Sequence, residues 1–444
     1  MKFFKNNFFY FIIIGIVLFL LPSGKFDSID GLMYLNTAKS IVYQGKFSID
    51  NKLPGLVKGT DGKLYSVGGL GWTTVLVIPV WLNKTFNGNP ENIEFLASFT
   101  NSILAFCLLV VCINLYTLVS KDKKASLVIA TIILFSTNLL PLAKHSFAHM
   151  LSILAATTAI YFGLKYSKTK NSKYLTLSGF FYGLLIISYN YSFVLISFSV
   201  FLLLLIKKFL NIKIVINWLY SVIPFLVLLF VYNYTRFGNI FESGYGSINM
   251  NGGDFQIKSS MFEGLWGLLL SSGKSIWVYS PILIYCLYFA VKNLKKYWID
   301  LLFLIVLVVN VIFYSRLAFW SGELSYGPRY LATIIPFGGL VLAKHWKEIN
   351  KKILIGLVVI GLWVQFVGIS IPYTKQYSWY DMEFMCVGSE GLTRKGELDY
   401  WSVGEFIPRY SPPYRLKRKL IEVWGNVFIN KNGELPDFWW ASKR

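Results

Sequence analysis

Charged side chains are scarce in this sequence. They make up 15% of the 444 residues, with 22 Asp and Glu against 43 Lys and Arg, whereas about a quarter of a typical soluble chain is charged. Cysteine is also rare, and the four residues form no C-x-x-C pair, which excludes a disulfide framework and a cysteine-rich metal site. The sequence shows no repeat of fixed period, which excludes a solenoid or a propeller.

Apolar residues are abundant instead. Hydrophobic residues make up 55% of the chain, and its mean hydropathy is +0.54. They come in long runs, such as 103–119, 193–206 and 353–371. A membrane-spanning helix needs roughly 17–25 mostly apolar residues, so the runs predict an all-α membrane protein with about eleven transmembrane helices. We place them at 8–22, 95–119, 125–142, 149–165, 174–190, 192–207, 214–233, 276–291, 299–315, 328–343 and 353–372.

Lysine clusters predict the orientation of these helices. With the N-terminus in the cytoplasm and 8–22 an uncleaved anchor, every cluster between helices falls on the cytoplasmic side, as the positive-inside rule requires. The clusters are Lys121/Lys123/Lys124, Lys165/Lys168/Lys170/Lys173, Lys207/Lys208/Lys213, Lys292/Lys295/Lys296 and Lys344/Lys347/Lys351/Lys352. Counting the short apolar segment 71–82 as a span would move the later clusters outward, so we expect an interfacial helix there. The net charge of +21 thus reflects topology, and nucleic acid is not an expected partner.

The chain is expected to have two parts. Residues 1–372 would form the membrane domain, with extracytoplasmic loops at 23–92 and 234–275, and residues 373–444 would form a small cap on the outer membrane surface. The tail is rich in Trp and Tyr, side chains that favour the membrane–water interface. We therefore expect a cell-membrane protein whose C-terminus is extracytoplasmic and which is surrounded by membrane lipid.

The polar residues of the outer loops are the candidates for chemistry. Asp27 and Asp30 follow the first helix, and a carboxylate at the membrane surface could take a proton from an attacking hydroxyl. Both could instead cap the next helix, because aspartate is favoured at helix starts. His145 and His149 are four residues apart, a spacing that could bind a divalent metal on one helix face, although a hydrogen-bonded interfacial pair is the more common case.

Basic residues on the same side could bind phosphate. Arg329, in the run Tyr326-Gly-Pro-Arg-Tyr330 and near Glu323, would stand at a helix start, where a guanidinium can grip a phosphate with two bonds. It could also extend to lipid headgroups. Arg236 and Lys274 are expected on the same face, and one carboxylate with several cations makes a plausible site for a phosphate donor and a hydroxyl acceptor.

In their order along the chain, these motifs resemble the GT-C glycosyltransferases of the protein O-mannosyltransferase and aminoarabinose transferase type (glycosyltransferase family 39). Asp30-Gly-Leu-Met-Tyr34 resembles the first-loop pattern of that family, and Asp61-Gly-Lys-Leu-Tyr65-Ser66 is similar to its next motif. The other matching stretches are His145-Ser-Phe-Ala-His149, Tyr232-Asn-Tyr-Thr-Arg236-Phe-Gly238, Ser271-Ser-Gly-Lys274 and Gly327-Pro-Arg329-Tyr330. The sequence departs from the family at Gly31 and His149, where relatives often carry an acid, and at Val67, where a basic residue is common.

The resemblance implies a GT-C bundle that transfers a sugar, with inversion, from a polyprenyl-phosphate-linked donor to an acceptor hydroxyl on a glycan, lipid or protein. Asp30 would be the catalytic base, and Arg329, with Lys274 or Arg236, would hold the donor phosphate. Tyr34, Tyr65, His145, His149, Glu323 and Tyr330 would be further site residues. Two alternatives remain open: a flippase or transporter for a lipid-linked sugar, and a polymerase or ligase that uses a diphosphate-linked donor.

Overall fold

The computed structural model describes residues 7–26, 28–50, 53–188, 190–207, 212–245, 261–317, 319–322, 325–371 and 436–441, and positions 420, 423, 424 and 426. Most of these residues are helical, and within them the strands β1 (Val57–Lys58) and β2 (Leu64–Tyr65) form a single antiparallel ribbon. The helices are α2 (Phe8–Leu20), α3 (Ile29–Gln44), α4 (Leu70–Thr85), α5 (Asn92–Ser98), α6 (Thr100–Ser120), α7 (Lys123–Phe135), α8 (Leu139–Lys144), α9 (His149–Thr169), α10 (Ser172–Ser188), α11 (Asn190–Ile206), α12 (Ile212–Phe237), α14 (Met261–Leu269), α15 (Ile276–Tyr279), α16 (Ile282–Lys292), α17 (Trp298–Ser315), η1 (Arg329–Ile334), α18 (Ile335–His345) and α19 (Lys351–Ser370).

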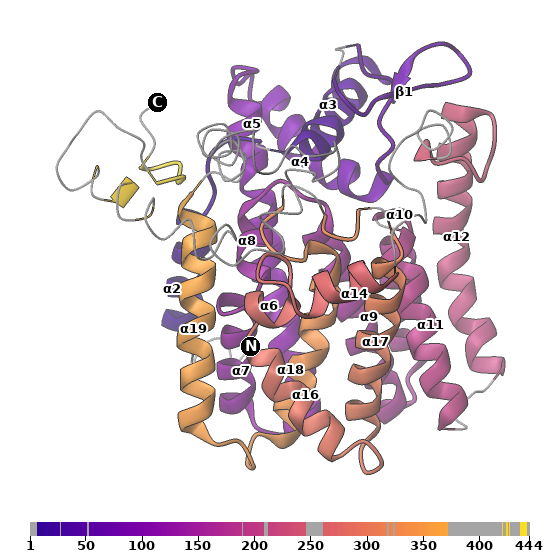
Figure 1. Cartoon of the computed structure of the whole chain (residues 1–444). Coiled ribbons are helices and arrows are strands. Elements are labelled where there is room, and N and C mark those ends of the chain that lie inside the picture. The colour runs from indigo at the N-terminus through magenta and orange to yellow at the C-terminus, as the bar shows by residue number, and fades with distance from the viewer. Residues whose placement is uncertain are drawn as a thin grey trace, which may run out of the picture.

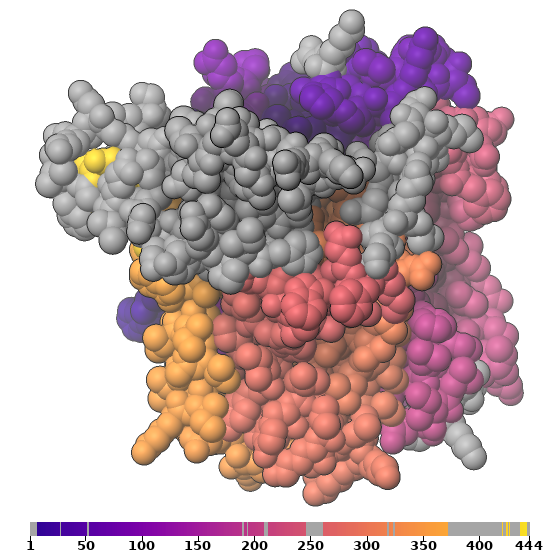
Figure 2. Space-filling view, in the orientation of Figure 1, coloured from indigo at the N-terminus to yellow at the C-terminus, as the bar shows by residue number. Residues whose placement is uncertain are grey.

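The long helices form one bundle, and α3, α4 and α5 lie across one end of it (Figure 1). We call this the α3 end. The loops α6–α7 and α16–α17, which carry two of the predicted lysine clusters, lie at the opposite end, which we call the lysine-rich end. In the space-filling view residues from the early part of the chain after α2, in purple, form the rim of the molecule at the α3 end (Figure 2).

The apolar surface of the bundle is that of a membrane protein. Within the described part of the chain, four helices are long and apolar enough to cross a bilayer: the continuous α5–α6 unit Asn92–Ser120, α12, α17 and α19. Shorter apolar helices cover Phe8–Leu20, Val194–Ile206 and Ile282–Lys292. Large apolar side chains, among them Ile355 and Val227, are more than half exposed on these helices. Because water would oppose such exposure, the predicted all-α multi-pass architecture is confirmed.

Every predicted span contains a helix, but three spans are interrupted. The 125–142 span bends between α7 and α8, the 276–291 span between α15 and α16, and the 328–343 span begins with the 3-10 turn η1. At the first interruption α19 approaches so closely that a Cβ on Gly361 would lie 2.3 Å from the Ser136 carbonyl oxygen. At the second, Pro281 has no backbone N–H to continue the helix. The Asn138 N–H at the first interruption donates a hydrogen bond to the Ser280 hydroxyl at the second, at 3.2 Å.

The segment 71–82 lies within α4, at the α3 end of the bundle, as Figure 1 shows. Trp72, Leu76 and Val80 are buried against α3 and α5, whereas Ile78 and Trp81 are more than half exposed. A helix with one packed face and one exposed apolar face is suited to lie in a membrane interface.

Candidate active site

Asp30 lies in the first turn of α3, and its neighbour Ser28 fixes that turn. Ser28 is the N-cap residue, and its hydroxyl accepts a hydrogen bond from the Gly31 N–H at 2.9 Å. The interpretation of Asp30 as a cap is therefore wrong, because serine takes that role and leaves the carboxylate available for other contacts. Asp27 lies outside the described residues.

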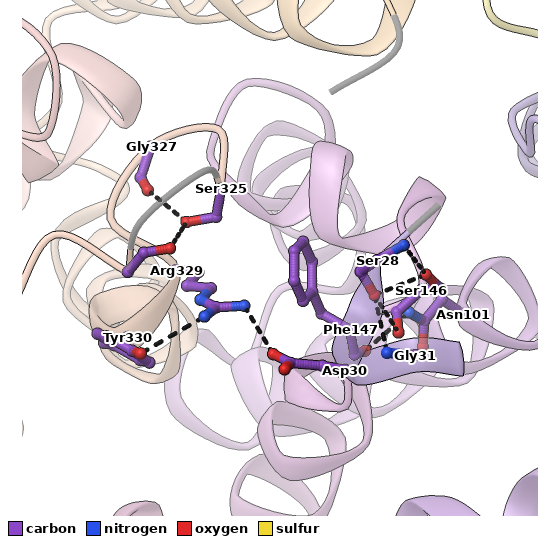
Figure 3. A network of polar contacts seen from close by, with 11 residues as sticks. Ser28, Asp30, Gly31, Asn101, Ser146, Phe147, Ser325, Gly327, Arg329 and Tyr330 are labelled. Atoms are coloured by element: carbon purple, nitrogen blue, oxygen red, sulfur yellow. Dashed lines mark hydrogen bonds and ion pairs between the residues drawn. The ribbon is translucent and has the colours of Figure 1, made fainter. Parts of the chain in front are cut away.

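The Asp30 carboxylate pairs with Arg329, which is 299 positions away in the sequence. Arg329 Nη1 lies 3.2 Å from Asp30 Oδ2 (Figure 3). The arginine side chain is 9% exposed and the aspartate side chain 48% exposed. The guanidinium also lies over the rings of Phe147 and Tyr330, with its carbon 4.6 and 5.2 Å from the ring centroids. A buried cation thus faces a carboxylate that solvent can reach.

The turn 145–147, between α8 and α9, connects both members of this pair. The Ser146 hydroxyl accepts a hydrogen bond from the Ser28 N–H at 3.2 Å and lies 2.9 Å from the Ser28 hydroxyl. Asn101 Nδ2 donates to the backbone carbonyls of His145 and Phe147 (Figure 3). Ser146 thus bonds to the start of α3, and the Phe147 ring packs against the Arg329 guanidinium, so this one turn contacts both the helix start beside Asp30 and the side chain of Arg329.

Gly31 allows α3 to approach the turn. A Cβ at this position would lie 2.6 Å from both the carbonyl oxygen and the Oγ of Ser146. A side chain of any kind, an acidic one included, would therefore not fit at position 31 beside this turn.

Gly31→Ala is expected to reduce the activity of this site by at least about tenfold, because displacing reacting groups by 1 Å can cost about a hundredfold in rate. The turnover of the purified variant measures this effect. Gly15→Ala is the matched control, since a Cβ at Gly15 meets nothing within 4 Å. Wild-type turnover in Gly31→Ala would mean that α3 and the turn can separate without harm to the site.

Tyr34 lies one turn beyond Asp30 on α3 and is buried. Burial first, and the Asp30 charge second, raise the pKa of its hydroxyl, which accepts a hydrogen bond from the Gly69 backbone. Burial and the 3.0 Å hydrogen bond to the Asp61 carboxylate raise the pKa of Tyr65 to about 12. Both tyrosines therefore stay protonated near neutral pH and can donate hydrogen bonds.

Lys274 and Arg236 make different contacts. Lys274 Nζ donates to the Ser325 carbonyl at 2.6 Å, in the loop that leads to Arg329. Arg236 donates to the carbonyls of Ser66 and Tyr232 and to Asn233 Oδ1, and its side chain is buried. These contacts tie α12 to the first loop. Among the described residues, the structure thus brings Arg329, and not Arg236, into contact with Asp30.

The two histidines do not share a helix face. His145 ends α8 in extended conformation and His149 begins α9, so the idea of a helical metal-binding pair is wrong. Within the described residues, no group of three His, Cys, Asp or Glu side chains has metal-binding proximity. The His149 ring lies 5.8 Å from that of Tyr330, which stacks on Tyr314 at 5.1 Å. Glu323 lies outside the described residues.

Sequence reasoning did not identify Ser28, Asn101, Ser146 or Phe147. A serine before a predicted helix is a capping signal that could have pointed to Ser28. The other three act through tertiary contacts, and no local pattern reports them.

Comparison with known proteins identifies the fold. The sequence matches no family model and no curated protein. The structure is similar to that of ArnT from Cupriavidus metallidurans bound to undecaprenyl phosphate, with a TM-score of 0.60 and 14% identity, over 96% of this chain and 80% of that chain. For ArnT in the apo state the TM-score is 0.58 at 14% identity, over 96% and 79% of the two chains.

An archaeal enzyme has the same architecture. The Archaeoglobus fulgidus oligosaccharyltransferase in the apo form gives a TM-score of 0.52 at 12% identity, over 94% of this chain and 56% of that chain. The chain therefore spans little more than half the length of the archaeal enzyme. Together these similarities show that the chain has the GT-C fold.

Proposed function

We infer that the protein is an inverting glycosyltransferase that moves a sugar from a polyprenyl-phosphate-linked donor to an acceptor hydroxyl on the extracytoplasmic face of the membrane. The observation that carries this proposal is the contact between Asp30 and Arg329 at the α3 end of a GT-C bundle. Support comes from ArnT, which has this fold and binds undecaprenyl phosphate, and from AglB of A. fulgidus, described in complex with a dolichol-phosphate (TM-score 0.50, 13% identity).

In a single displacement reaction, Asp30 would act on the attacking hydroxyl and Arg329 on the leaving phosphate. Asp30 accepts the proton of the acceptor hydroxyl while the acceptor oxygen forms a bond to the anomeric carbon of the sugar. The bond from that carbon to the phosphate oxygen breaks, and polyprenyl phosphate leaves with the electron pair. Arg329 stabilises the charge that develops on this phosphate. A single displacement inverts the anomeric carbon and needs one base and one cation.

The Asp30–Arg329 ion pair is compatible with these two roles. Without donor, Arg329 holds the Asp30 carboxylate in place, and the half-exposed carboxylate stays open to an acceptor. When a donor phosphate binds the Arg329 guanidinium, the Asp30 carboxylate leaves the ion pair and can accept a hydrogen bond from the acceptor hydroxyl.

The positions of the lysine clusters support a reaction on the extracytoplasmic side of the membrane. The clusters of the α6–α7 and α16–α17 loops lie at the end of the bundle opposite α3, and positive loops remain in the cytoplasm. On this reasoning the N-terminus is cytoplasmic, and the site and the segment 373–444 face outward from the cell membrane. The acceptor is a hydroxyl of a glycan, lipid or protein.

Reconstitution tests the proposal. The protein in lipid nanodiscs is supplied with polyprenyl-phosphate hexoses and pentoses and with acceptor hydroxyls. We expect acceptor-dependent release of polyprenyl phosphate and a product of inverted anomeric configuration by NMR. Turnover only with diphosphate-linked donors would indicate a polymerase or ligase, and movement of the lipid-linked sugar across a bilayer without transfer would indicate a flippase.

A further inference from the structure

The C-terminal residues Pro436–Ala441 join the ends of two distant helices. The Asp437 N–H donates to the Ser370 carbonyl at 3.0 Å, at the end of α19. The Trp439 N–H donates to the Pro22 carbonyl at 2.9 Å, just beyond α2. The last carbonyls of a helix lack partners within the helix, so these bonds satisfy groups that would otherwise need water.

Aromatic side chains strengthen this attachment. The indole N–H groups of Trp439 and Trp440 donate to the carbonyls of Phe19 and Leu20 at 3.0 and 2.8 Å. The Trp439 ring packs edge-on against the ring of Phe19, with 5.5 Å between centroids. We call residues 436–441 the C-terminal latch; they lie beside α19 at the α3 end (Figure 1).

The latch reaches the active-site region through one ion pair. Lys144 Nζ lies 2.6 Å from Asp437 Oδ2, with the lysine side chain fully buried and the aspartate side chain 16% exposed. The same ammonium donates to the Ile369 carbonyl and lies 4.9 Å from the centre of the Phe438 ring. A buried ammonium without its carboxylate is strongly unfavourable, so this pair fixes the position of Lys144.

Lys144 is the residue that precedes the turn 145–147. Ser146 in that turn holds the cap of α3, and Phe147 lies against the Arg329 guanidinium. One ion pair, the turn 145–147 and one contact between a ring and a guanidinium therefore connect Asp437 to Arg329. Beyond the Asn101 bonds, the Ser102 hydroxyl donates to the Ala143 carbonyl at 3.0 Å, which holds the same segment from the side of α6. The turn is held between α6 and the C-terminal latch.

We propose that Asp437 and Lys144 are positioning residues for sugar transfer, and that the C-terminal latch sets the separation of Asp30 and Arg329 through the turn 145–147. This inference rests on the proposed transferase function. The pair touches no substrate. Its effect is on the geometry of the catalytic residues, so it changes the rate of the chemical step more than the binding of substrates.

Asp437→Asn is expected to lower kcat about tenfold, since small displacements of reacting groups have large effects on rate. The KM for the donor should stay within about twofold, because a displaced base leaves ground-state binding in place.

Lys144→Arg, which keeps the positive charge, should retain more of the wild-type activity than Lys144→Met. Asp50→Asn is the matched control: Asp50 pairs with Lys46 at 2.8 Å at the same end, but its side chain is 61% exposed. That variant should keep wild-type kcat.

Hydrogen exchange tests the same proposal without an activity assay. In Asp437→Asn, peptides that cover 28–34 and 143–149 should exchange faster, while peptides from α17 and α18 stay unchanged. Wild-type kcat or unchanged exchange in 143–149 would overturn the positioning role. A global rise in exchange together with a lower unfolding temperature would show a purely structural role and overturn it as well. If the wild-type protein transfers no sugar to any acceptor, the proposed function fails, and the exchange experiment still decides on the latch.

Discussion

Asp30→Asn is expected to lower the single-turnover rate of sugar transfer by about 10²–10⁴, the range that general bases contribute. The amide keeps the shape of the side chain and can still accept a hydrogen bond from Arg329, but it cannot take the proton of the acceptor. The unfolding temperature should change little, because the carboxylate is 48% exposed and partly exposed ion pairs add little stability. Rapid-quench measurement with saturating donor gives the rate.

Glu94→Gln is the control for this variant. Glu94 is an acid of α5 at the same end of the bundle, 4.0 Å from Lys39 and 43% exposed. It should retain the wild-type rate. If Asp30→Asn also transfers sugar at the wild-type rate, Asp30 is not the base.

Arg329→Met is expected to reduce kcat/KM by about 10²–10³ or more, which is the loss seen when one stabilising donor of a transition-state charge is removed. The methionine keeps much of the packing against Phe147 and Tyr330, so lost charge and not lost volume should dominate. Arg329→Lys should recover only part of the activity, because an ammonium cannot grip two phosphate oxygens in one plane. Steady-state kinetics over a range of donor concentrations measure both variants.

Arg316→Met serves as the control for charge. Arg316 follows the end of α17 and is exposed, so its loss should leave kcat/KM unchanged. A similar loss in both variants would point to general electrostatic attraction of the anionic donor. Unchanged kinetics in Arg329→Met would remove this arginine from the site.

The membrane helices were predictable because their signal is local. A run such as 353–371 is long and apolar, and it forms α19 with ends that differ by only a few residues. The interruptions were not predictable, because they depend on neighbours: Ser136 ends α7 where the backbone of Gly361 approaches it. The expected helix at 328–343 likewise begins with the 3-10 turn η1, which places Arg329 within reach of Asp30.

The site was predictable only in part. Asp30 and Arg329 stand in motifs that resemble a known family, so both could be proposed before their contact was known. Arg236 shows the limit of such reasoning: this arginine stands in a matching motif, but its buried side chain donates to the carbonyl of Ser66 in the first loop and to that of Tyr232 in its own helix. The partners that set the geometry, Ser146 and Lys144, are common residues whose roles arise from contacts with segments over 100 residues away.

The central claim is that Arg329 holds the phosphate of a lipid donor beside the base Asp30. A cryo-electron microscopy structure of the protein with polyprenyl phosphate tests it most directly. We predict phosphate oxygens within about 3 Å of the Arg329 guanidinium nitrogens, in a cavity that the Asp30 carboxylate also faces. A phosphate bound at the lysine-rich end, or at the α3 end but out of reach of Arg329, would contradict the account.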